Sequence, residues 1–389
     1  MAMVGDRIDR FTLVRQLGAG GMGATWEAVR QSGNEFEQRV AIKLANREHL
    51  ATPDGLAAFR REAALAASLR HPNIAAVLDV DETVGCIVCE LVDGADLRAV
   101  LRAAPGGTFE PAITVHIIGQ IARGLSHAHR RILRGRPSPV IHRDMSPGNV
   151  VIDYDGNVKI VDFGIAQVMV GGVAPAESLK GKLAYMAPEQ AMGSRMDGRS
   201  DQYALGVIAY EALSGARPNQ GAHEGETLGC ILAGKHVPLL QRAPSVPKGL
   251  ANVVERMLAL RPEQRFATFD AMLDALAEFT PPLTVHRALV PLVVAARQPH
   301  TIVRENGRFI SRPVEAEPLL QQVSAAEAMV SAARLQGVAT TPALPSPRDS
   351  GGLLGVLALQ PDGRRTPVVP GLAAQAFAPT LGSLPLTRR

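Results

Sequence analysis

The hydrophobic pattern changes near residue 93, and this change constrains the fold of the 389-residue chain more than any other feature. Before it, five short apolar runs predict β-strands at residues 11–17, 24–29, 39–44, 74–80 and 86–92. One amphipathic segment among them, residues 54–69, predicts a helix. After it, helical spacing predicts helices at residues 111–129, 201–213, 252–260 and 269–279, with a short β-like stretch at 150–161. The sequence therefore predicts an α+β protein: a small five-stranded β lobe with one helix (10–92) and a larger, mainly helical lobe (93–279).

A glycine-rich loop, GAGGMG at residues 18–23, lies between the first two predicted strands. A GxGxxG motif alone is a weak signal, because dinucleotide-binding sites share it. Such sites place a helix directly after the third glycine, whereas residues 24–29 have the pattern of a strand. A glycine loop between two strands can instead fold over phosphate groups, because its backbone N–H groups approach the oxygens without side chains in the way.

Lys43 ends an otherwise apolar predicted strand. An ammonium group in such a place is costly to desolvate unless it has partners. A phosphate and a carboxylate would serve, and Glu62 on the predicted helix is the candidate carboxylate. Taken singly, each of these charges is more simply an ordinary surface group.

Three further motifs follow in order: HRDMSPGN at residues 142–149, DFG at 162–164 and APE at 187–189. With the glycine loop, Lys43, the segment 200–206 and Arg265, the chain resembles the eukaryotic-like (Hanks-type) protein kinases, in their bacterial serine/threonine branch. The motifs span residues 10–279, and their number and order make a chance match negligible. The resemblance implies a bilobal protein-kinase fold and transfer of the γ-phosphoryl group of ATP to protein Ser or Thr hydroxyls in bacterial signalling.

The resemblance also assigns roles to single residues. Asp144 would orient the substrate hydroxyl and accept its proton, and Lys43, held by Glu62, would bind the α- and β-phosphates. Asn149 and Asp162 would bind Mg²⁺, with Mn²⁺ as a second candidate, because hard oxygen ligands suit a hard cation. Glu189 would pair with Arg265, and the segment 200–206 would anchor the catalytic loop. The residues expected to contact ATP are Gly18, Ala19, Gly20, Gly21, Met22, Gly23, Thr25, Ala41, Lys43, Glu90, Val92 and Asp96.

Two positions depart from the family pattern. The serine/threonine branch usually has Lys two residues after the catalytic Asp, where this chain has Ser146, and usually has Thr where this chain has Lys182. Because the family fold places these positions side by side, one hypothesis is that Lys182 supplies the ammonium group that Ser146 lacks. The alternative is that Lys182 is a solvated charge and that Ser146 only lowers the rate.

Regulation is suggested by Arg143, which directly precedes the catalytic Asp. In the family, such kinases are often activated by phosphorylation of the activation segment, which then pairs with this arginine. Ser178 is the only Ser or Thr between Gly164 and Ala187. The resemblance therefore implies autophosphorylation at Ser178.

The amino-acid composition changes after residue 279. Residues 280–389 contain 14 of the 28 prolines and are predicted to form a Pro/Ala-rich tail, largely disordered or a very small module. Within it, residues 301–310 carry Asn306-Gly307 between apolar runs, a hairpin signal. Residues 317–335 could form a helix, and residues 357–368 a second hairpin.

Composition narrows the partners and the compartment. The net charge of +4 is concentrated as isolated arginines in residues 280–389, a pattern that argues against nucleic acid as a partner. Residues 1–7 lack the apolar core of a signal peptide, and no apolar run approaches the roughly 20 residues of a membrane span. Cys86, Cys89 and Cys230 fit a reducing compartment. The sequence thus predicts a cytoplasmic protein, bound to no membrane, whose partners are ATP, protein substrates and a second copy for autophosphorylation in trans.

A pseudokinase is the competing interpretation, in which the chain acts as a nucleotide-binding or interaction scaffold. Pseudokinases usually lose one of the principal catalytic residues. This chain keeps all of them and the three loop glycines, and lacks only the auxiliary lysine. These residues favour an active enzyme.

Overall fold

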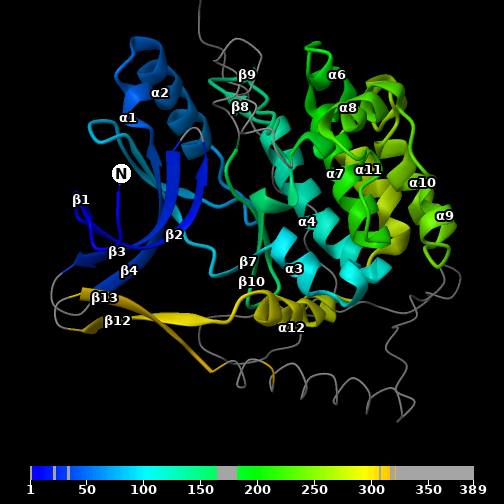
Figure 1. The fold of residues 1–389 in the computed structure, drawn as a ribbon. Coiled ribbons are helices and arrows are strands. Elements are labelled where there is room, and N and C mark those ends of the chain that lie inside the picture. The colour runs from blue at the N-terminus through cyan, green and yellow to red at the C-terminus, as the bar shows by residue number, and fades with distance from the viewer. Residues whose placement is uncertain are drawn as a thin grey trace, which may run out of the picture. The chain divides into compact units, whose positions relative to one another are not determined.

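The computed structural model describes residues 2–20, 23–32, 36–163, 182–305, 308–315 and 320. All of them belong to one compact unit, residues 1–332. As the sequence predicts, this unit has an N-terminal lobe built on a β-sheet and a larger, mainly helical C-terminal lobe (Figure 1).

An antiparallel six-stranded sheet, ordered β1-β2-β3-β4-β6-β5, forms the N-terminal lobe. Its strands are β1 (Arg7–Ile8), β2 (Phe11–Gly20), β3 (Gly23–Ser32), β4 (Phe36–Ala45), β5 (Val77–Asp81) and β6 (Cys86–Glu90). Two helices lie between β4 and β5: α1 (Arg47–Leu50) and α2 (Pro53–Ala67). Residues 91–93, called the hinge below, connect this lobe to the next.

Helix α2 is the one predicted from the pattern of residues 54–69. It begins after Thr52, whose hydroxyl accepts a hydrogen bond from the N–H of Gly55, and Pro53 occupies the first turn. Phe59 and Ala63 pack against Ile87 of β6. The amphipathic spacing thus fixes one face of α2 on the sheet, and Glu62, between these two residues in sequence, is also buried.

The N-terminal lobe differs from the prediction in several details, and β2, β3 and β4 each extend beyond their predicted ranges. Strand β1 and helix α1 are additions, too short to produce a periodic pattern. Strand β5 begins at Val77 rather than residue 74, because Ile74 instead forms a parallel bridge with Ile160 of the other lobe. Strand β6 ends at Glu90, directly before the hinge, rather than at residue 92.

The C-terminal lobe surrounds two buried helices, α4 (Pro111–His129) and α7 (Gly198–Ser214). Helix α7 starts at Asp197, whose carboxylate accepts from the N–H of Arg199, and stops at Gly215, whose φ of 72° suits glycine. The other helices are α3 (Leu97–Ala103), α6 (Pro188–Ala191), α8 (Glu224–Ala233), α9 (Leu239–Arg242), α10 (Lys248–Met257) and α11 (Phe269–Leu276). Short 3-10 turns are η1 (Pro105–Gly107), η2 (Pro147–Asn149), η4 (Leu183–Tyr185), η5 (Pro262–Gln264) and η6 (Ala277–Phe279).

Small strand pairs position the loops of the C-terminal lobe. Strands β7 (Gly94–Asp96), β10 (Val150–Asp153) and β11 (Val158–Ile160) form a three-stranded sheet in the order β11-β10-β7. Asp96 of β7 is opposite Val151 of β10. The exit of the hinge is therefore hydrogen-bonded to the strand that follows the segment 142–149. A second pair, β8 (Ile132–Leu133) and β9 (Arg136–Pro137), forms a two-stranded ribbon.

Residues 283–313 differ from the expected loosely packed tail. They form η7 (Leu283–Val285), α12 (His286–Ala296) and an antiparallel hairpin of β12 (His300–Glu305) and β13 (Arg308–Pro313). Leu289, Val290 and Val293 are buried, because their spacing places them on one face of α12 against the C-terminal lobe. Figure 1 shows the gold hairpin running from the end of α12 toward the N-terminal sheet.

The hairpin prediction for residues 301–310 is confirmed by the pairing of Glu305 with Arg308. The predicted second hairpin at 357–368 lies outside the described residues, as does the predicted helix at 317–335 apart from residue 320. The boundary proposed at residue 279 therefore stays a prediction for the remainder of the chain.

Among the residues that the structure describes, no single helix is long and apolar enough to cross a membrane. The segments Phe269–Phe279 and Leu283–Ala296 meet that criterion only when taken together, and they are bent by 95° relative to each other.

We predict that Leu289→Ala destabilises the protein by about 2–5 kcal/mol, because the leucine is fully buried and its loss leaves a cavity. Leu283→Ala is the matched control, since that leucine is 93% exposed and its truncation should change stability by no more than about 0.5 kcal/mol. Urea unfolding followed by circular dichroism measures both. Equal stability of the two variants would show that α12 is not part of the folded core.

Candidate active site

The catalytic-loop motif, residues 142–149, is held from below by Asp201 of helix α7. Its carboxylate accepts hydrogen bonds from the backbone N–H of His142 (2.8 Å) and of Arg143 (2.9 Å), and His129 Nε2 lies 2.8 Å from it. Burial alone raises the pKa of Asp201, but these partners outweigh it and the pKa lies below its ordinary value. Arg143 adopts a φ of 67°, a left-handed conformation unusual for arginine. The two backbone bonds to Asp201 stabilise the turn.

Asn149 fixes the carboxylate of Asp144. Its side-chain Nδ2 donates to the backbone oxygen of Asp144 at 2.6 Å and to Oδ2 at 3.1 Å. The backbone N–H of Asn149 donates to the carbonyl of Ser146 within the same turn. Because Nδ2 is committed to Asp144, the amide oxygen of Asn149 points away from it and remains available as a ligand atom.

Lys182 reaches the same carboxylate. Its Nζ lies 2.5 Å from Asp144 Oδ2, although 38 residues separate the two in sequence. Ser146 is fully buried, and its hydroxyl has no hydrogen-bond partner among the described residues. The structure thus brings together Asp144 and Lys182, as the exchange hypothesis requires, and leaves the hydroxyl of Ser146 without a hydrogen-bond partner in the described part of the chain.

A second group forms around Lys43 on β4. Its Nζ lies 2.7 Å from Glu62 Oε1 on α2 and 3.7 Å from Asp162 Oδ1. Burial lowers the pKa of Lys43, but the carboxylates of Asp162 and Glu62 outweigh burial, so the pKa is raised and the ammonium stays charged at neutral pH. Asp162 itself adopts a left-handed φ of 53°.

Two oxygen donors suited to a divalent metal are present. Asp162 offers a carboxylate whose side chain is 45% exposed, and Asn149 offers its amide oxygen. Carboxylate and amide oxygens are the ligands that Mg²⁺ takes. The donor chemistry therefore fits the metal that the family implies.

Strand register places the expected nucleotide contacts on one face of the sheet. Thr25 of β3 is opposite Lys43, and Glu27 is opposite Ala41. Because side chains alternate along a strand, Thr25, Ala41 and Lys43 share that face. Gly18, Ala19 and Gly20 end β2, Gly23 begins β3, and Gly21 and Met22 lie outside the described residues. At Gly23, φ is 144° and an added Cβ would meet the carbonyl oxygen of Leu44 at 1.9 Å, so only glycine fits.

The hinge-side residues make contacts that the sequence does not reveal. Glu90 ends β6, and its carboxylate pairs with Lys159 of β11 at 2.8 Å. Asp96 is the N-cap of α3, because its Oδ1 accepts from the N–H of Ala99 at 3.0 Å. Val92 lies in the hinge and is half-buried. Asp96 therefore caps a helix in addition to making the ATP contact expected of it.

The pair expected between Glu189 and Arg265 is confirmed. Arg265 donates to both carboxylate oxygens of Glu189, at 2.7 and 2.9 Å, and the hydroxyl of Ser200 donates to Oε1 at 2.7 Å. Both charged side chains are almost completely buried. The next residue, Gln190, donates from Nε2 to the carbonyl of Arg143 at 3.0 Å. The buried pair thus fixes the end of the activation segment beside the catalytic loop.

His129 and Gln190 are the supporting residues that sequence reasoning missed. His129 is the last residue of an amphipathic helix, where a polar residue is ordinary, and Gln190 follows the APE motif without a pattern of its own. Ser178, the predicted phosphorylation site, lies outside the described residues.

Residues 11–276 match the protein kinase domain family. The chain is 38% identical to the tyrosine-protein kinase MasK of Myxococcus xanthus over 69% of its length, and 35% identical to the serine/threonine-protein kinase PknA of Mycobacterium tuberculosis over 69%. The alignments cover 43% of MasK and 61% of PknA. The chain thus spans less than two thirds of either relative.

Solved structures agree. The crystal structure of the PknI kinase domain of Mycobacterium tuberculosis matches 72% of this chain and all of that domain, with a TM-score of 0.54 and 28% identity. The fold and the motifs define a two-lobed protein kinase domain. The chain belongs to the protein kinase family, and its relatives include bacterial kinases of the Hanks type.

We predict that Glu189→Gln lowers the free energy of unfolding at pH 7 by about 3–5 kcal/mol, because it leaves the buried guanidinium of Arg265 without its counter-charge. Burial raises the pKa of Glu189, but Arg265 outweighs it and the pKa lies below the ordinary 4.5. The carboxylate therefore contributes stability above pH 4.5 that is lost as the pH falls through its folded-state pKa.

The difference in the free energy of unfolding between wild type and Glu189→Gln should accordingly become smaller below pH 4.5. Urea titrations at pH 7, 5 and 4 measure it, with Glu278→Gln on the exposed face of η6 as control. A gap that stays constant over this range would show that the charge of Glu189 does not stabilise the fold.

Proposed function

We propose that this chain is an active protein kinase that transfers the γ-phosphoryl group of ATP to serine or threonine hydroxyls of proteins. One observation carries the proposal: Lys43, Glu62 and Asp162, from three separate elements, meet within 3.7 Å, while Asp144, Asn149 and Lys182 meet in the same unit. Phosphoryl transfer requires positioning and neutralisation of charge more than covalent chemistry. These two groups supply both.

Asp144 is the proposed proton acceptor. Its Oδ2 already accepts from Asn149 and Lys182, which leaves Oδ1 to accept a hydrogen bond from the substrate hydroxyl and then its proton. The fixed orientation of the carboxylate lowers the entropic cost of aligning the hydroxyl. Asn149 and Lys182 therefore act partly as positioning residues for Asp144.

Lys43 is the proposed ligand of the α- and β-phosphates, held in place by Glu62. Its raised pKa keeps the positive charge available across the neutral range. Mg²⁺, or Mn²⁺ in its place, would neutralise phosphate charge when bound by Asp162 and the amide oxygen of Asn149. The glycines of residues 18–23, Thr25, Ala41, Glu90, Val92 and Asp96 complete the proposed ATP contacts.

Lys182 is the proposed replacement for the catalytic-loop lysine that is absent at Ser146. Its ammonium group reaches the catalytic carboxylate from the activation segment rather than from the catalytic loop. From there it can stabilise the negative charge that develops on the transferred group.

Substrate class, location and regulation complete the proposal. Relatives named serine/threonine kinases favour Ser and Thr as acceptors, whereas the name of MasK makes Tyr the alternative to be tested. We place the chain in the bacterial cytoplasm, with protein substrates and with self-association that permits phosphorylation of Ser178 in trans. Phosphate on Ser178 would then pair with Arg143.

The decisive experiment is transfer of ³²P from [γ-³²P]ATP·Mg²⁺ by the full chain, with and without a generic protein substrate. We predict label on serine or threonine, including Ser178, and none with Asp144→Asn. Phosphoamino-acid analysis and mass spectrometry identify the acceptors. Label on tyrosine alone would overturn the Ser/Thr assignment, and absence of label with nucleotide still bound would favour a scaffold.

We predict that Lys182→Ala lowers kcat by about 10²-fold, the order expected for loss of one electrostatic partner of the transition state. Lys235→Ala, at an exposed cation of the same lobe, is the matched control and should leave kcat unchanged. A loss of less than threefold in Lys182→Ala would show that Lys182 is only a solvated charge.

The exchange can also be reversed. The double variant Ser146→Lys/Lys182→Thr restores the usual family arrangement and should recover part of the activity that Lys182→Ala loses. Recovery would show that the two positions serve one charge. A double variant no more active than Lys182→Ala, yet folded by circular dichroism, would argue against the exchange.

A further inference from the structure

A buried carboxylate on the N-terminal sheet is paired with two guanidinium groups of the same sheet. Glu27 of β3 is fully buried, and Arg15 of β2 and Arg39 of β4 lie 2.5 and 2.7 Å from its two oxygens. Burial raises the pKa of Glu27, but the two guanidinium groups outweigh it, so the pKa lies below its ordinary value and the carboxylate is charged. Three strands of the sheet are joined at this point.

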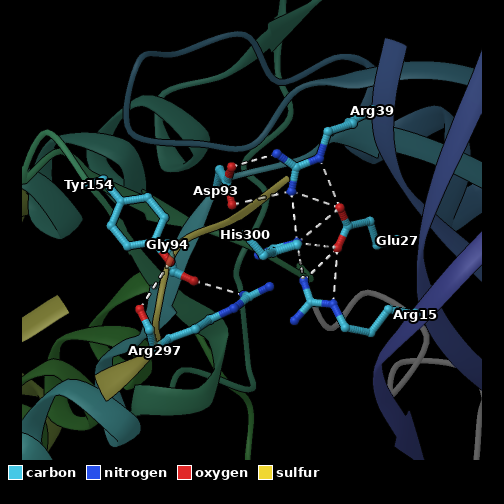
Figure 2. A network of polar contacts seen from close by, with 8 residues as sticks. All are labelled: Arg15, Glu27, Arg39, Asp93, Gly94, Tyr154, Arg297 and His300. Carbon is cyan, nitrogen blue, oxygen red and sulfur yellow. Dashed lines mark hydrogen bonds and ion pairs between the residues drawn. The ribbon is translucent and has the colours of Figure 1, made fainter. Parts of the chain in front are cut away.

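The cluster is completed by a residue that follows the region matched by the protein kinase family, which ends at residue 276. His300, the first residue of β12, places Nε2 at 3.1 Å from Arg15 Nη2, 2.9 Å from Arg39 Nη2 and 3.0 Å from Glu27 Oε2. Figure 2 shows the imidazole between the two guanidinium groups and the carboxylate. The histidine side chain is 8% exposed, and the hairpin also contacts β2 through β13. A segment nearly 300 residues away in sequence therefore seals the cluster.

The other end of this segment is attached beside the hinge. Arg297 donates from Nη1 to the carbonyl oxygen of Gly94 at 2.8 Å, and its own carbonyl accepts from the hydroxyl of Tyr154 at 3.0 Å. Arg39 donates to Asp93 in the hinge at 2.6 Å, so the cluster and the hinge are also joined directly (Figure 2). Only Gln298 and Pro299 separate Arg297 from His300, which makes the link between the two attachments short.

The cluster lies on the face of the sheet that carries the catalytic lysine. Glu27 is opposite Ala41, two residues from Lys43, and it is two residues from Thr25. Since alternate residues of a strand share a face, Glu27, Thr25, Ala41 and Lys43 point the same way. Strands β2 and β3, which carry Arg15 and Glu27, also bear the glycine loop between them. A displacement of the cluster relative to the hinge would therefore move the surfaces expected to enclose the nucleotide.

We propose that Arg297 and His300 are positioning residues: they brace the nucleotide-facing side of the N-terminal sheet against the hinge, so that nucleotide affinity depends on residues 297–313. The effect on nucleotide affinity rests on the proposed kinase function, whereas the contacts that form the brace are a property of the fold. Without His300, Glu27 keeps both arginines and Arg39 keeps Asp93, so the lobe retains its charge balance and loses only the contacts that residue 300 makes with the cluster.

The test compares His300→Ala with wild type in the full chain, using calorimetric binding of Mg·ADP. We expect the Kd to rise on the order of tenfold, the equivalent of one hydrogen bond to a charged group. His300→Gln, which keeps a polar side chain able to donate and accept, should recover part of the affinity. Arg304→Ala removes an exposed cation from the same strand and should change the Kd by no more than about twofold.

The readout separates bracing from mere stability. A variant that is only less stable raises the apparent Kd by no more than the inverse of its folded fraction, which urea unfolding measures, so a mostly folded variant should keep the wild-type Kd. Hydrogen exchange provides a nucleotide-independent measurement, and the amides of β2 and β3 should exchange faster in His300→Ala than in Arg304→Ala. Unchanged exchange in β2 and β3, or an unchanged Kd in a protein that binds Mg·ADP, would overturn the brace.

Failure of the brace and failure of the kinase proposal are distinguishable. A wild-type chain that transfers phosphate while His300→Ala shows normal Kd and exchange retains its function and loses the brace. A wild-type chain without transfer, in which His300→Ala nevertheless loosens β2 and β3, retains the brace and loses the function.

Discussion

The buried carboxylate of Asp201 is the interaction on which the catalytic loop depends. It accepts two backbone N–H groups from the turn at His142 and Arg143 and faces His129, so three segments of the C-terminal lobe converge on a single side chain. A buried charge is tolerated only where donors surround it. The same requirement therefore makes Asp201 an organiser: unless the loop adopts its left-handed turn at Arg143, the carboxylate loses its two backbone donors and keeps only His129.

Much of the fold and of the site could be predicted from the sequence, because both depend on local signals. Strands, helices and the hairpin at Asn306-Gly307 have hydrophobic periods or turn residues that need no tertiary information. The proximity of Lys182 to Asp144 was predictable because one lysine is lost at Ser146 and one gained at residue 182, two positions that the family fold places side by side. The contacts of His129, Gln190 and Lys159 were not predictable, since each is a common polar residue whose partner comes from a distant segment.

The packing of residues 283–313 could not be predicted from the amino-acid composition either. The high proline content of residues 280–389 predicts poor packing. It is an average over the whole segment, and it gives no indication that α12 within that segment has a buried face. Leu289, Val290 and Val293 occupy a single helical face, and Pro291 between them is tolerated in the helix. Composition averages over a segment, whereas burial is decided by the few residues that meet a surface already formed by the C-terminal lobe.

Two contacts distinguish this chain: Lys182 with Asp144, and His300 with Glu27. In each, a polar group comes from a segment far away in sequence. A cation beside Asp144 comes from Lys182, seven residues before Glu189, which is held by the buried pair with Arg265. The enclosure of Glu27 is completed by His300, beyond the matched family region that ends at residue 276. In each case a site formed by two lobes gains a dependence on the position of a third element. Under the two proposals above, a signal that moved either element would act directly on the active site.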